Sequence, residues 1–286
     1  MTAPLVHPTP PKPKSPRRAR SSRLNPLVIG GVALIVGMLA VGFIAPHFLP
    51  DPLATAAADA SQPPSAEHWF GTDRYGRDVL ARTIDAIQLD LTLALACAIA
   101  AFTVGTVLGT LAGFMGGVVD EIIMRFIDIL AAFPAFVLAI LVAFALGDGV
   151  VFAVAGVALA AVPEFVRLTR ARALSIRRQD FVLASRVLGV RALVIAWTHV
   201  APNSTGPAIV QAAFVGGSAI LYLAGLAFLG VGVHPPQAEW GVMISEGSAE
   251  IVRGIWWSSL FPGLFILLAA VGFHLISDGM ARGQHD

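Results

Sequence analysis

Residues 91–119 read LTLALACAIAAFTVGTVLGTLAGFMGGVV, a run without one charged side chain. A helix needs about 20 mostly apolar residues to cross the hydrocarbon layer of a bilayer, so this run is long enough for one crossing. Other uncharged intervals flank it, at 24–50, 129–147, 149–163, 192–238 and 254–277. The shortest can continue to about residue 168, and the longest is interrupted by prolines, so its crossing should begin near Pro207. The sequence therefore predicts an all-α polytopic membrane protein with six transmembrane helices.

The composition agrees with a membrane protein. Of the 286 residues, 56% are hydrophobic and only 13% are charged, against about 25% charged in a typical soluble domain. The net charge is +1, and the bases occur in short stretches rather than over one broad face, which argues against nucleic-acid binding. The single cysteine, Cys97, excludes an intramolecular disulfide and any CxxC metal pattern.

The distribution of lysine and arginine predicts the orientation of the chain. Residues 1–26 are rich in bases and proline and contain no acid, so they are expected to form a disordered, basic, cytoplasmic tail. The first transmembrane helix should then cover 27–49, as an anchor rather than a cleaved signal peptide. An outer loop with an interfacial helix is expected at 50–87, followed by a core of five transmembrane helices over 88–282. Most remaining bases then lie inside, which places both termini in the cytoplasm.

The second half of the outer loop, HWFGTDRYGRDVL at 68–80, has features of a short helix. Thr72 is a candidate N-cap, and the spacing of Asp73 with Arg77 and of Asp78 with Arg82 favours ion pairs one helical turn apart. We expect a helix lying in the outer membrane interface. The alternative is a solvated charged turn.

The third predicted span begins with acidic side chains near the inner boundary. Glu121 and Arg125 are one helical turn apart, and Asp128 lies one turn deeper. An acid inside a membrane is a functional candidate. The alternative, which the position near the helix end favours, is that Asp128 reaches the interface or pairs with Arg125.

The cytoplasmic segment 169–203 is too regularly patterned for a simple connector and is expected to form two helices. In the first helix, small and apolar side chains share one face, and Gly189 can end it in the left-handed conformation. The second should run from Val190 to Val200 and stop at Pro202. A short helix with small residues at the centre of its apolar face is suited to docking on another protein. An amphipathic helix resting on the inner leaflet is equally compatible with the periodicity.

At these residues the sequence resembles a known family, the permease subunits of bacterial ATP-binding-cassette importers, in the branch that serves dipeptides, oligopeptides and nickel. The outer motif of that branch is matched by Gly71, Thr72, Asp73, Gly76, Arg77 and Asp78. The start of its next core helix is matched by Asp120, Arg125, Asp128 and Pro134. Its ATPase-docking loop is matched around Asp180, Phe181, Ala184, Ser185, Arg186, Leu188, Gly189, His199 and Pro202. Leu183 stands where that loop normally has an acid, and Ser185 where it has alanine.

The resemblance implies the permease core of a type I importer and a set of partners. These are a second homologous permease subunit, two cytoplasmic ATPase subunits and an extracytoplasmic substrate-binding protein, assembled in the bacterial inner membrane. The chain contains no GxxxxGK[ST] phosphate loop. We therefore expect a non-catalytic subunit without a cofactor or metal of its own, with ATP and magnesium bound by the partner ATPases.

Peptides are the first expectation for the substrate, while nickel, glutathione and haem remain open. An ion-coupled secondary transporter is disfavoured because the centres of the spans are almost free of charge. A membrane enzyme would have to use Glu164 with Arg167, or His274 with Asp278, pairs that are better explained as contacts within a helix. Four outer residues are expected to face the binding protein, or alternatively to pack on each other or on the sister subunit: Glu239, Trp240, Glu246 and Glu250.

Overall fold

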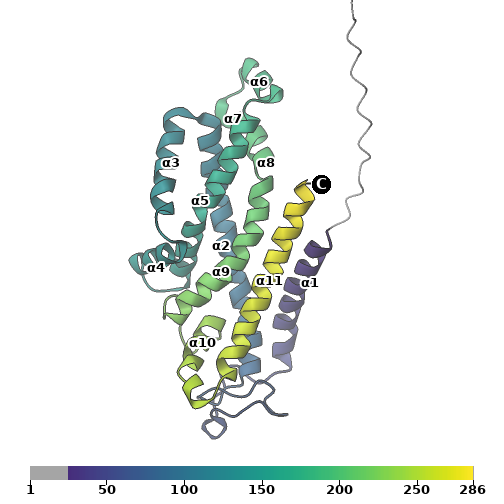
Figure 1. The fold of residues 1–286 in the computed structure, drawn as a ribbon, viewed down its shortest axis with the longest axis vertical. Coiled ribbons are helices and arrows are strands. Elements are labelled where there is room, and N and C mark those ends of the chain that lie inside the picture. Colours follow the sequence, from purple (N-terminus) through teal and green to yellow (C-terminus); the bar gives the residue numbers. More distant parts are fainter. Residues whose placement is uncertain (1–24, 286) are drawn as a thin grey trace, which may run out of the picture.

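The computed structural model describes residues 25–285, so most of the expected basic tail lies outside the described residues. Helices account for nearly all of its regular structure (Figure 1). The α-helices are α1 Pro26–Ile44, α2 Val79–Met115, α3 Gly117–Ala131, α4 Ala135–Leu146, α5 Val150–Ile176, α6 Asp180–Val187, α7 Ala192–Ile195, α8 Ala201–Ser204, α9 Gly206–Phe228, α10 Trp240–Ser248 and α11 Trp257–His285. A π-helical segment, Ala196–Val200, joins α7 to α8.

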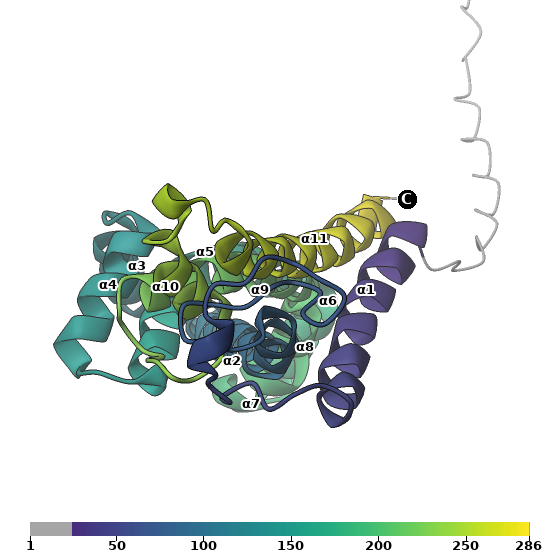
Figure 2. The ribbon, with the colours of Figure 1, turned by 90° about the horizontal axis from the view of Figure 1, so that it is seen from below.

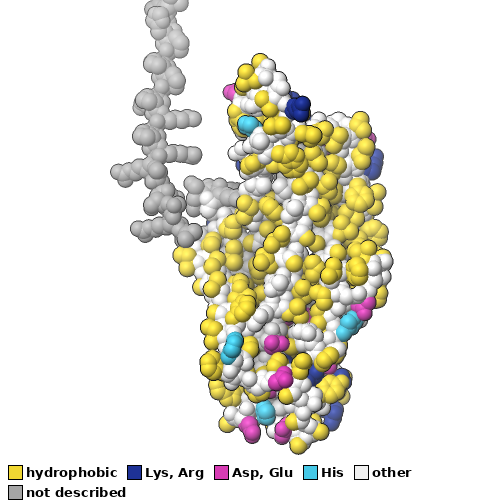
Figure 3. All heavy atoms as spheres, turned by 180° about the vertical axis from the view of Figure 1, so that it is seen from behind, with side chains coloured by type: hydrophobic (Ala, Val, Ile, Leu, Met, Phe, Trp, Pro, Cys, Tyr) yellow, Lys and Arg dark blue, Asp and Glu magenta, His cyan; other side chains and the backbone are white. Residues whose placement is uncertain are grey.

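By length and composition, five helices of the described chain can cross a membrane: α1, α2, α5, α9 and α11. The bent pair α3 and α4 provides a sixth crossing if the two count as one span. Hydrophobic side chains cover the middle of the molecule, and charged side chains gather toward its two ends (Figure 3). This distribution is what a protein surrounded by lipid requires, and it agrees with the predicted architecture.

Helices α2 and α5 form the tightly packed centre of the bundle. Glycines on one face of α2 let the two backbones approach closely. A Cβ atom added at Gly105 would lie 2.2 Å from Cβ of Phe165, and one at Gly109 would lie 2.7 Å from the carbonyl oxygen of Val166. Because the hydrophobic effect does not drive helices together within lipid, such close contact between small residues is the main source of helix association there.

The two described ends of the chain lie side by side. Asn25 caps α1, and its side-chain Nδ2 donates to the carbonyl oxygen of Gly279 near the end of α11, 3.2 Å away. Helices α1 and α11 are therefore antiparallel neighbours. The N-terminus of α1 and the C-terminus of α11 point toward the end of the bundle that carries α6 (Figure 1). At the opposite end, the loop between α1 and α2 runs across the helix ends (Figure 2).

The expected interfacial helix within 50–87 is wrong. Residues 72–78 form a turn closed by an antiparallel bridge between Thr72 and Asp78, and α2 then begins at Val79 as part of one long helix. Asp78, rather than Thr72, is the N-cap, because its Oδ1 accepts from the backbone N–H of Ala81 at 2.8 Å. Gly76, with φ of +72°, prevents a helix from starting earlier.

The third predicted span consists of two helices rather than one. The chain bends by 97° between α3 and α4. Pro134 occupies the N-cap position of α4, because a proline disfavours helical conformation in the residue before it and has no N–H to continue the ladder.

Pro202 does not stop the second cytoplasmic helix as expected. Helical structure continues through it into α8 and is nearly continuous with α9. Proline removes one backbone donor, and the wider π-helical turns of the preceding segment accommodate the loss. The side-chain Nδ2 of Asn203 donates to the carbonyl oxygen of His199 at 2.6 Å, which provides that oxygen with a partner.

Candidate functional site

Helix α6 projects from one end of the bundle and contains the predicted docking residues (Figure 1). One side chain anchors it: Val182 is fully buried. It packs with Phe114 of α2, with Ala173 and Ile176 of α5, and with the segment that begins at Ile195. Burial of one valine contributes about 1.5 kcal/mol. This contact fixes the helix on the ends of α2 and α5, and the sequence pattern did not reveal it.

The C-terminus of α6 confirms the expected glycine cap. Gly189 has φ of +78°. The backbone N–H of Val190 donates to the carbonyl oxygen of Ser185 at 3.1 Å, and that of Gly189 donates to Arg186 at 3.0 Å. This pair of bonds defines the Schellman motif, in which the residue after the helix adopts a left-handed conformation. The geometry reverses the chain sharply and keeps α6 short.

The face predicted for docking is turned outward. Phe181 and Ala184 are exposed, and Leu188 is 81% exposed. Ser185 is half-buried, and its hydroxyl donates to the carbonyl oxygen of Phe181 at 2.8 Å, so it needs no external partner. Leu183, at the position where the family pattern has an acid, is also exposed. No part of the chain between residues 25 and 285 thus covers the apolar face of α6.

The remaining polar groups of the docking loop hold it in shape or face outward. The guanidinium of Arg186 lies over the ring of Phe114 at 4.9 Å, a cation–π contact that fixes the side of α6 opposite the exposed face. The ring of His199 lies 6.2 Å from that of Phe181. Asp180 is exposed in the first turn of α6, and Pro202 is exposed in α8. The structure therefore brings all the predicted docking residues to one end of the molecule.

Two ion pairs fasten α3 to α5 close to the α6 end. Asp120 accepts two hydrogen bonds from Arg170, at 2.5 and 2.7 Å. Asp128 pairs with Arg167 at 3.0 Å. The expected pairing of Asp128 with Arg125 is wrong, because α3 turns this carboxylate toward α5. Arg125 is exposed, and within residues 25–285 it forms no ion pair.

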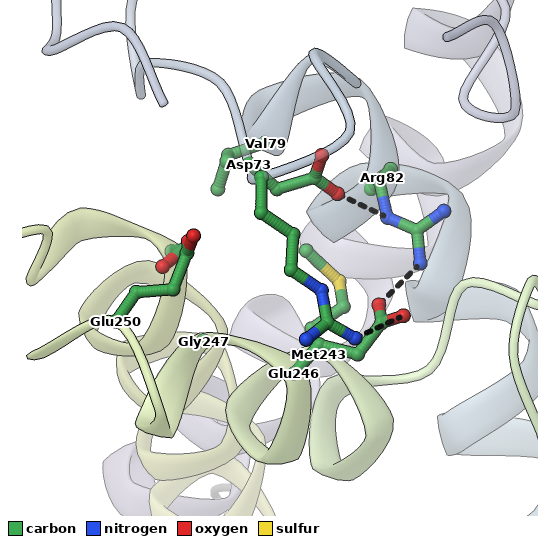
Figure 4. A pocket seen from close by; sticks show the side chains of 9 residues that line it. Asp73, Val79, Arg82, Met243, Glu246, Gly247 and Glu250 are labelled. Atoms are coloured by element: carbon green, nitrogen blue, oxygen red, sulfur yellow. Dashed lines mark ion pairs between the residues drawn. The ribbon is translucent and has the colours of Figure 1, made fainter. Parts of the chain in front are cut away.

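The outer motif forms a buried polar cluster. Asp73 accepts from the backbone N–H of Tyr75 at 2.8 Å and from Nε of Arg77 at 2.6 Å, which confirms the pair expected one turn apart. Arg77 continues to Glu246 of α10 at 2.7 Å. The pair expected between Asp78 and Arg82 is not formed. Arg82 lies instead between Asp73 and Glu246 (Figure 4), while Asp78 binds His68 at 2.8 Å.

The glycines of this motif are required by close packing. Gly71 has φ of +72°, and a Cβ there would lie 2.6 Å from the carbonyl oxygen of Gln62. Thr72, between this glycine and Asp73, is fully buried, and its hydroxyl accepts from the backbone N–H of Gln62 at 2.8 Å. The motif thus ties the preceding loop to the start of α2, which is a structural role.

The prediction that four residues face a binding protein is wrong: Glu239, Trp240, Glu246 and Glu250. Glu239 and Trp240 are 2% and 0% exposed, Glu250 is 4% exposed, and Glu246 lies against the arginines of the cluster. The indole Nε1 of Trp240 donates to the carbonyl oxygen of Thr83 at 3.0 Å. These side chains point inward because α10 packs on the start of α2, and Glu246 neutralises the buried arginines Arg77 and Arg82.

A pair of buried acids was not found by sequence reasoning. Asp90 of α2 and Glu239 at the N-terminus of α10 share a hydrogen bond and are almost inaccessible. Glu239 caps α10 through the N–H of Val242 at 2.6 Å, and Asp90 accepts from the N–H of Trp240 at 3.1 Å. Burial raises the pKa of Glu239 to about 7. These residues lie far apart in the sequence, so no local pattern connects them.

The two pairs considered for an enzyme do not form. Arg167 binds Asp128, and Glu164 accepts a hydrogen bond from Gln211 of α9 instead. His274 contacts the carbonyl oxygen of Ala270 at 2.7 Å rather than Asp278. Within the described residues, no group of three or more His, Cys, Asp or Glu is arranged to hold a metal ion.

Comparison with known proteins places the chain in one family. Residues 105–284 match the family described as binding-protein-dependent transport system inner membrane component. The chain is 38% identical to the dipeptide transport system permease protein DppC of Alkalihalophilus pseudofirmus, over 97% of this chain and 94% of that protein. It is 39% identical to the probable D,D-dipeptide permease DdpC of Escherichia coli K12, over 90% and 86% of the two chains. The oligopeptide permease OppC of Bacillus subtilis is 34% identical, over 90% and 85%.

These relatives span nearly the same length as this chain, and the described residues contain several helices long and apolar enough to cross a membrane. The protein is thus a multi-pass inner membrane permease subunit and a non-catalytic component of its transport system. On this evidence the chain belongs to the family of binding-protein-dependent transport system inner membrane components, the permeases of type I ATP-binding-cassette importers.

Proposed function

We propose that this chain is one of two permease subunits of an ATP-driven importer that carries dipeptides and oligopeptides across the inner membrane. The peptide assignment is supported by the relatives, which are named as dipeptide, D,D-dipeptide and oligopeptide permeases. A second permease subunit, two ATPases that bind ATP and magnesium, and an extracytoplasmic binding protein complete the importer.

The way α6 is packed supports a role in coupling the ATPase to the membrane helices. Its apolar face is exposed, while Val182 on another side is fully buried against α2 and α5. An exposed apolar helix face is costly in water and is typical of a partner-binding surface. The rigid anchor means that a movement of the partner ATPase at α6 is passed directly to two membrane-crossing helices.

Transport assays on a complete importer test this proposal. The chain and its partner subunits would be expressed in a strain without other peptide importers, and uptake of labelled dipeptides would be measured. Ala184→Arg places a charge in the middle of the exposed face, and we expect it to abolish uptake and ATPase copurification. Its amount in the membrane should not change, because this side chain contacts nothing in the core. Arg172→Ala, on the exposed end of α5, is the matched control.

Normal uptake by Ala184→Arg would refute the docking role of α6. No uptake of any peptide by the unaltered importer, together with uptake of nickel, glutathione or haem, would refute the peptide assignment and leave the docking role standing.

A further inference from the structure

Glu164 is an acid in an unusual place. It lies near the middle of α5, which begins at Val150. About 20 residues of helix span the hydrocarbon layer, so that layer extends to roughly Thr169 and includes position 164. The side chain is exposed on the surface of this chain. A carboxylate in direct contact with lipid is strongly unfavourable, so this face of α5 must lie against water or protein.

The carboxylate does not reach toward the membrane boundary. It is directed sideways to α9, where Nε2 of Gln211 donates to its Oε2. Arg167, the nearest base on α5, is engaged by Asp128. Within residues 25–285, no lysine, arginine or histidine forms an ion pair with Glu164, and its Oε1 has no hydrogen-bond donor. The negative charge of Glu164 is therefore free to pair with a group from outside the described residues.

A cavity of about 60 Å³ adjoins Glu164 between α4, α5 and α9. Small side chains of α4 and α5 form one wall, and Phe214, Ser218 and Tyr222 of α9 form the other. The ring of Tyr222 also lies 5.9 Å from that of Phe136 of α4. The cavity combines one carboxylate, two hydroxyls and aromatic rings, a lining that suits a small cation. It is too small for a whole peptide residue.

We propose that Glu164 receives the α-ammonium group of a peptide as the peptide passes along this wall of the permease. This inference rests on the proposed function, because it takes peptides as the cargo. Peptides differ in their side chains but share a free ammonium terminus, so it is the one cation on which a conduit for many peptides can rely. One carboxylate holds it briefly without the multiple contacts that would slow release.

Accessibility to thiol reagents provides the first test. Cys97 is the only cysteine and is fully buried, so a cysteine introduced elsewhere is the reactive one. In the assembled importer, Glu164→Cys should react with a hydrophilic cationic methanethiosulfonate reagent, and a dipeptide supplied with binding protein and ATP should slow the reaction. Val36→Cys, exposed on α1, is the control and should stay unreactive. An unreactive cysteine at 164 would mean contact with lipid or with the sister subunit and would overturn the proposal.

Transport provides the second test. Glu164→Gln keeps the hydrogen bond with Gln211 but removes the charge, and we expect dipeptide uptake to fall about tenfold, the value of one hydrogen bond to a charged group. ATPase stimulation by the loaded binding protein should be unchanged. Glu164→Asp retains the charge and should recover much of the uptake. Glu121→Gln, which removes an exposed acid from α3, should have no effect.

The outcomes separate this inference from the proposed function. Equal uptake by Glu164→Gln and the unaltered importer would overturn the role of Glu164 while leaving peptide import intact. Loss of the assembled complex in Glu164→Gln, but not in Glu164→Asp, would assign the carboxylate to a base of the sister subunit and also overturn the proposal. An unaltered importer that moves no peptide would refute the proposed function itself.

Discussion

The buried pair of Asp90 and Glu239 makes the stability of the outer end of the bundle depend on pH. Burial raises the pKa of Glu239 to about 7, against a usual value of about 4.3 for an unfolded glutamate. The folded protein therefore binds more protons than the unfolded chain between these values, and the free energy of unfolding decreases as the pH rises through this range. The stabilisation is fully present below about pH 4 and is lost by about pH 7 to 8.

The magnitude follows from the size of the shift. One pKa unit corresponds to about 1.4 kcal/mol, so Glu239 contributes a change of about 4 kcal/mol across this interval. Glu239→Gln stays neutral at every pH and keeps an oxygen that can accept from the N–H of Val242, the bond that caps α10. The variant should match the unaltered protein near pH 5 and be more stable than it near pH 8.

Thermal unfolding in detergent, followed at pH 5, 6, 7 and 8, is the appropriate assay. Both proteins contain the same histidines, so the difference between them isolates the pair of Glu239 and Asp90. A difference that grows by a few kcal/mol with pH supports a proton held by this pair. A constant difference, or a variant that becomes less stable as the pH rises, would refute the reasoning.

Three other substitutions test contacts at separate places. Gly76→Ala should lower the free energy of unfolding by about 3 kcal/mol, since its Cβ would lie 1.9 Å from the carbonyl oxygen of Ala56 at φ of +72°; a melting temperature within a degree of the unaltered protein would contradict this. Asp120→Asn should cost about 1 kcal/mol in thermal unfolding by weakening its partly exposed pair with Arg170, and no loss would mean that the pair contributes nothing. Gly189→Val should strain the left-handed cap by about 1 kcal/mol and reduce ATPase copurification at an unchanged level in the membrane; full copurification would show that the cap does not position α6.

Sequence reasoning was most reliable where a single local property decides the structure. Uncharged runs of about 20 residues have few alternatives to a transmembrane helix, and the long helices lie where these runs predicted them. The cap at Gly189 followed from one residue type with access to the left-handed region. The side chains predicted to share one face of α6 lie on its exposed side, because a period of 3.6 residues fixes which side chains share a side.

The predictions from sequence were wrong where contacts between residues far apart in the chain determine the structure. Charged spacing around residues 73–82 suits a helix, but Gly76 must pass close to Ala56 and therefore adopts a turn. Glu246 of α10 appeared to be a surface group because sequence alone does not show that the buried Arg77 and Arg82 lie beside it. The same limitation concealed the contact of Glu164 with α9, since no pattern along α5 indicates its neighbour.

The packing of α2 and α5 explains how events at α6 can reach the opposite end of the protein. Val182 packs against both helices at the end of the bundle that carries α6, and glycines of α2 hold the two backbones together farther along, as at Gly105. Because such close backbone contact leaves little room for sliding, the two helices should move as one body. The outer end of α2 is fixed in turn to α10 through Arg82 and Glu246 (Figure 4). Displacement of α6 would therefore move the outer charged cluster and the wall that carries Glu164 together.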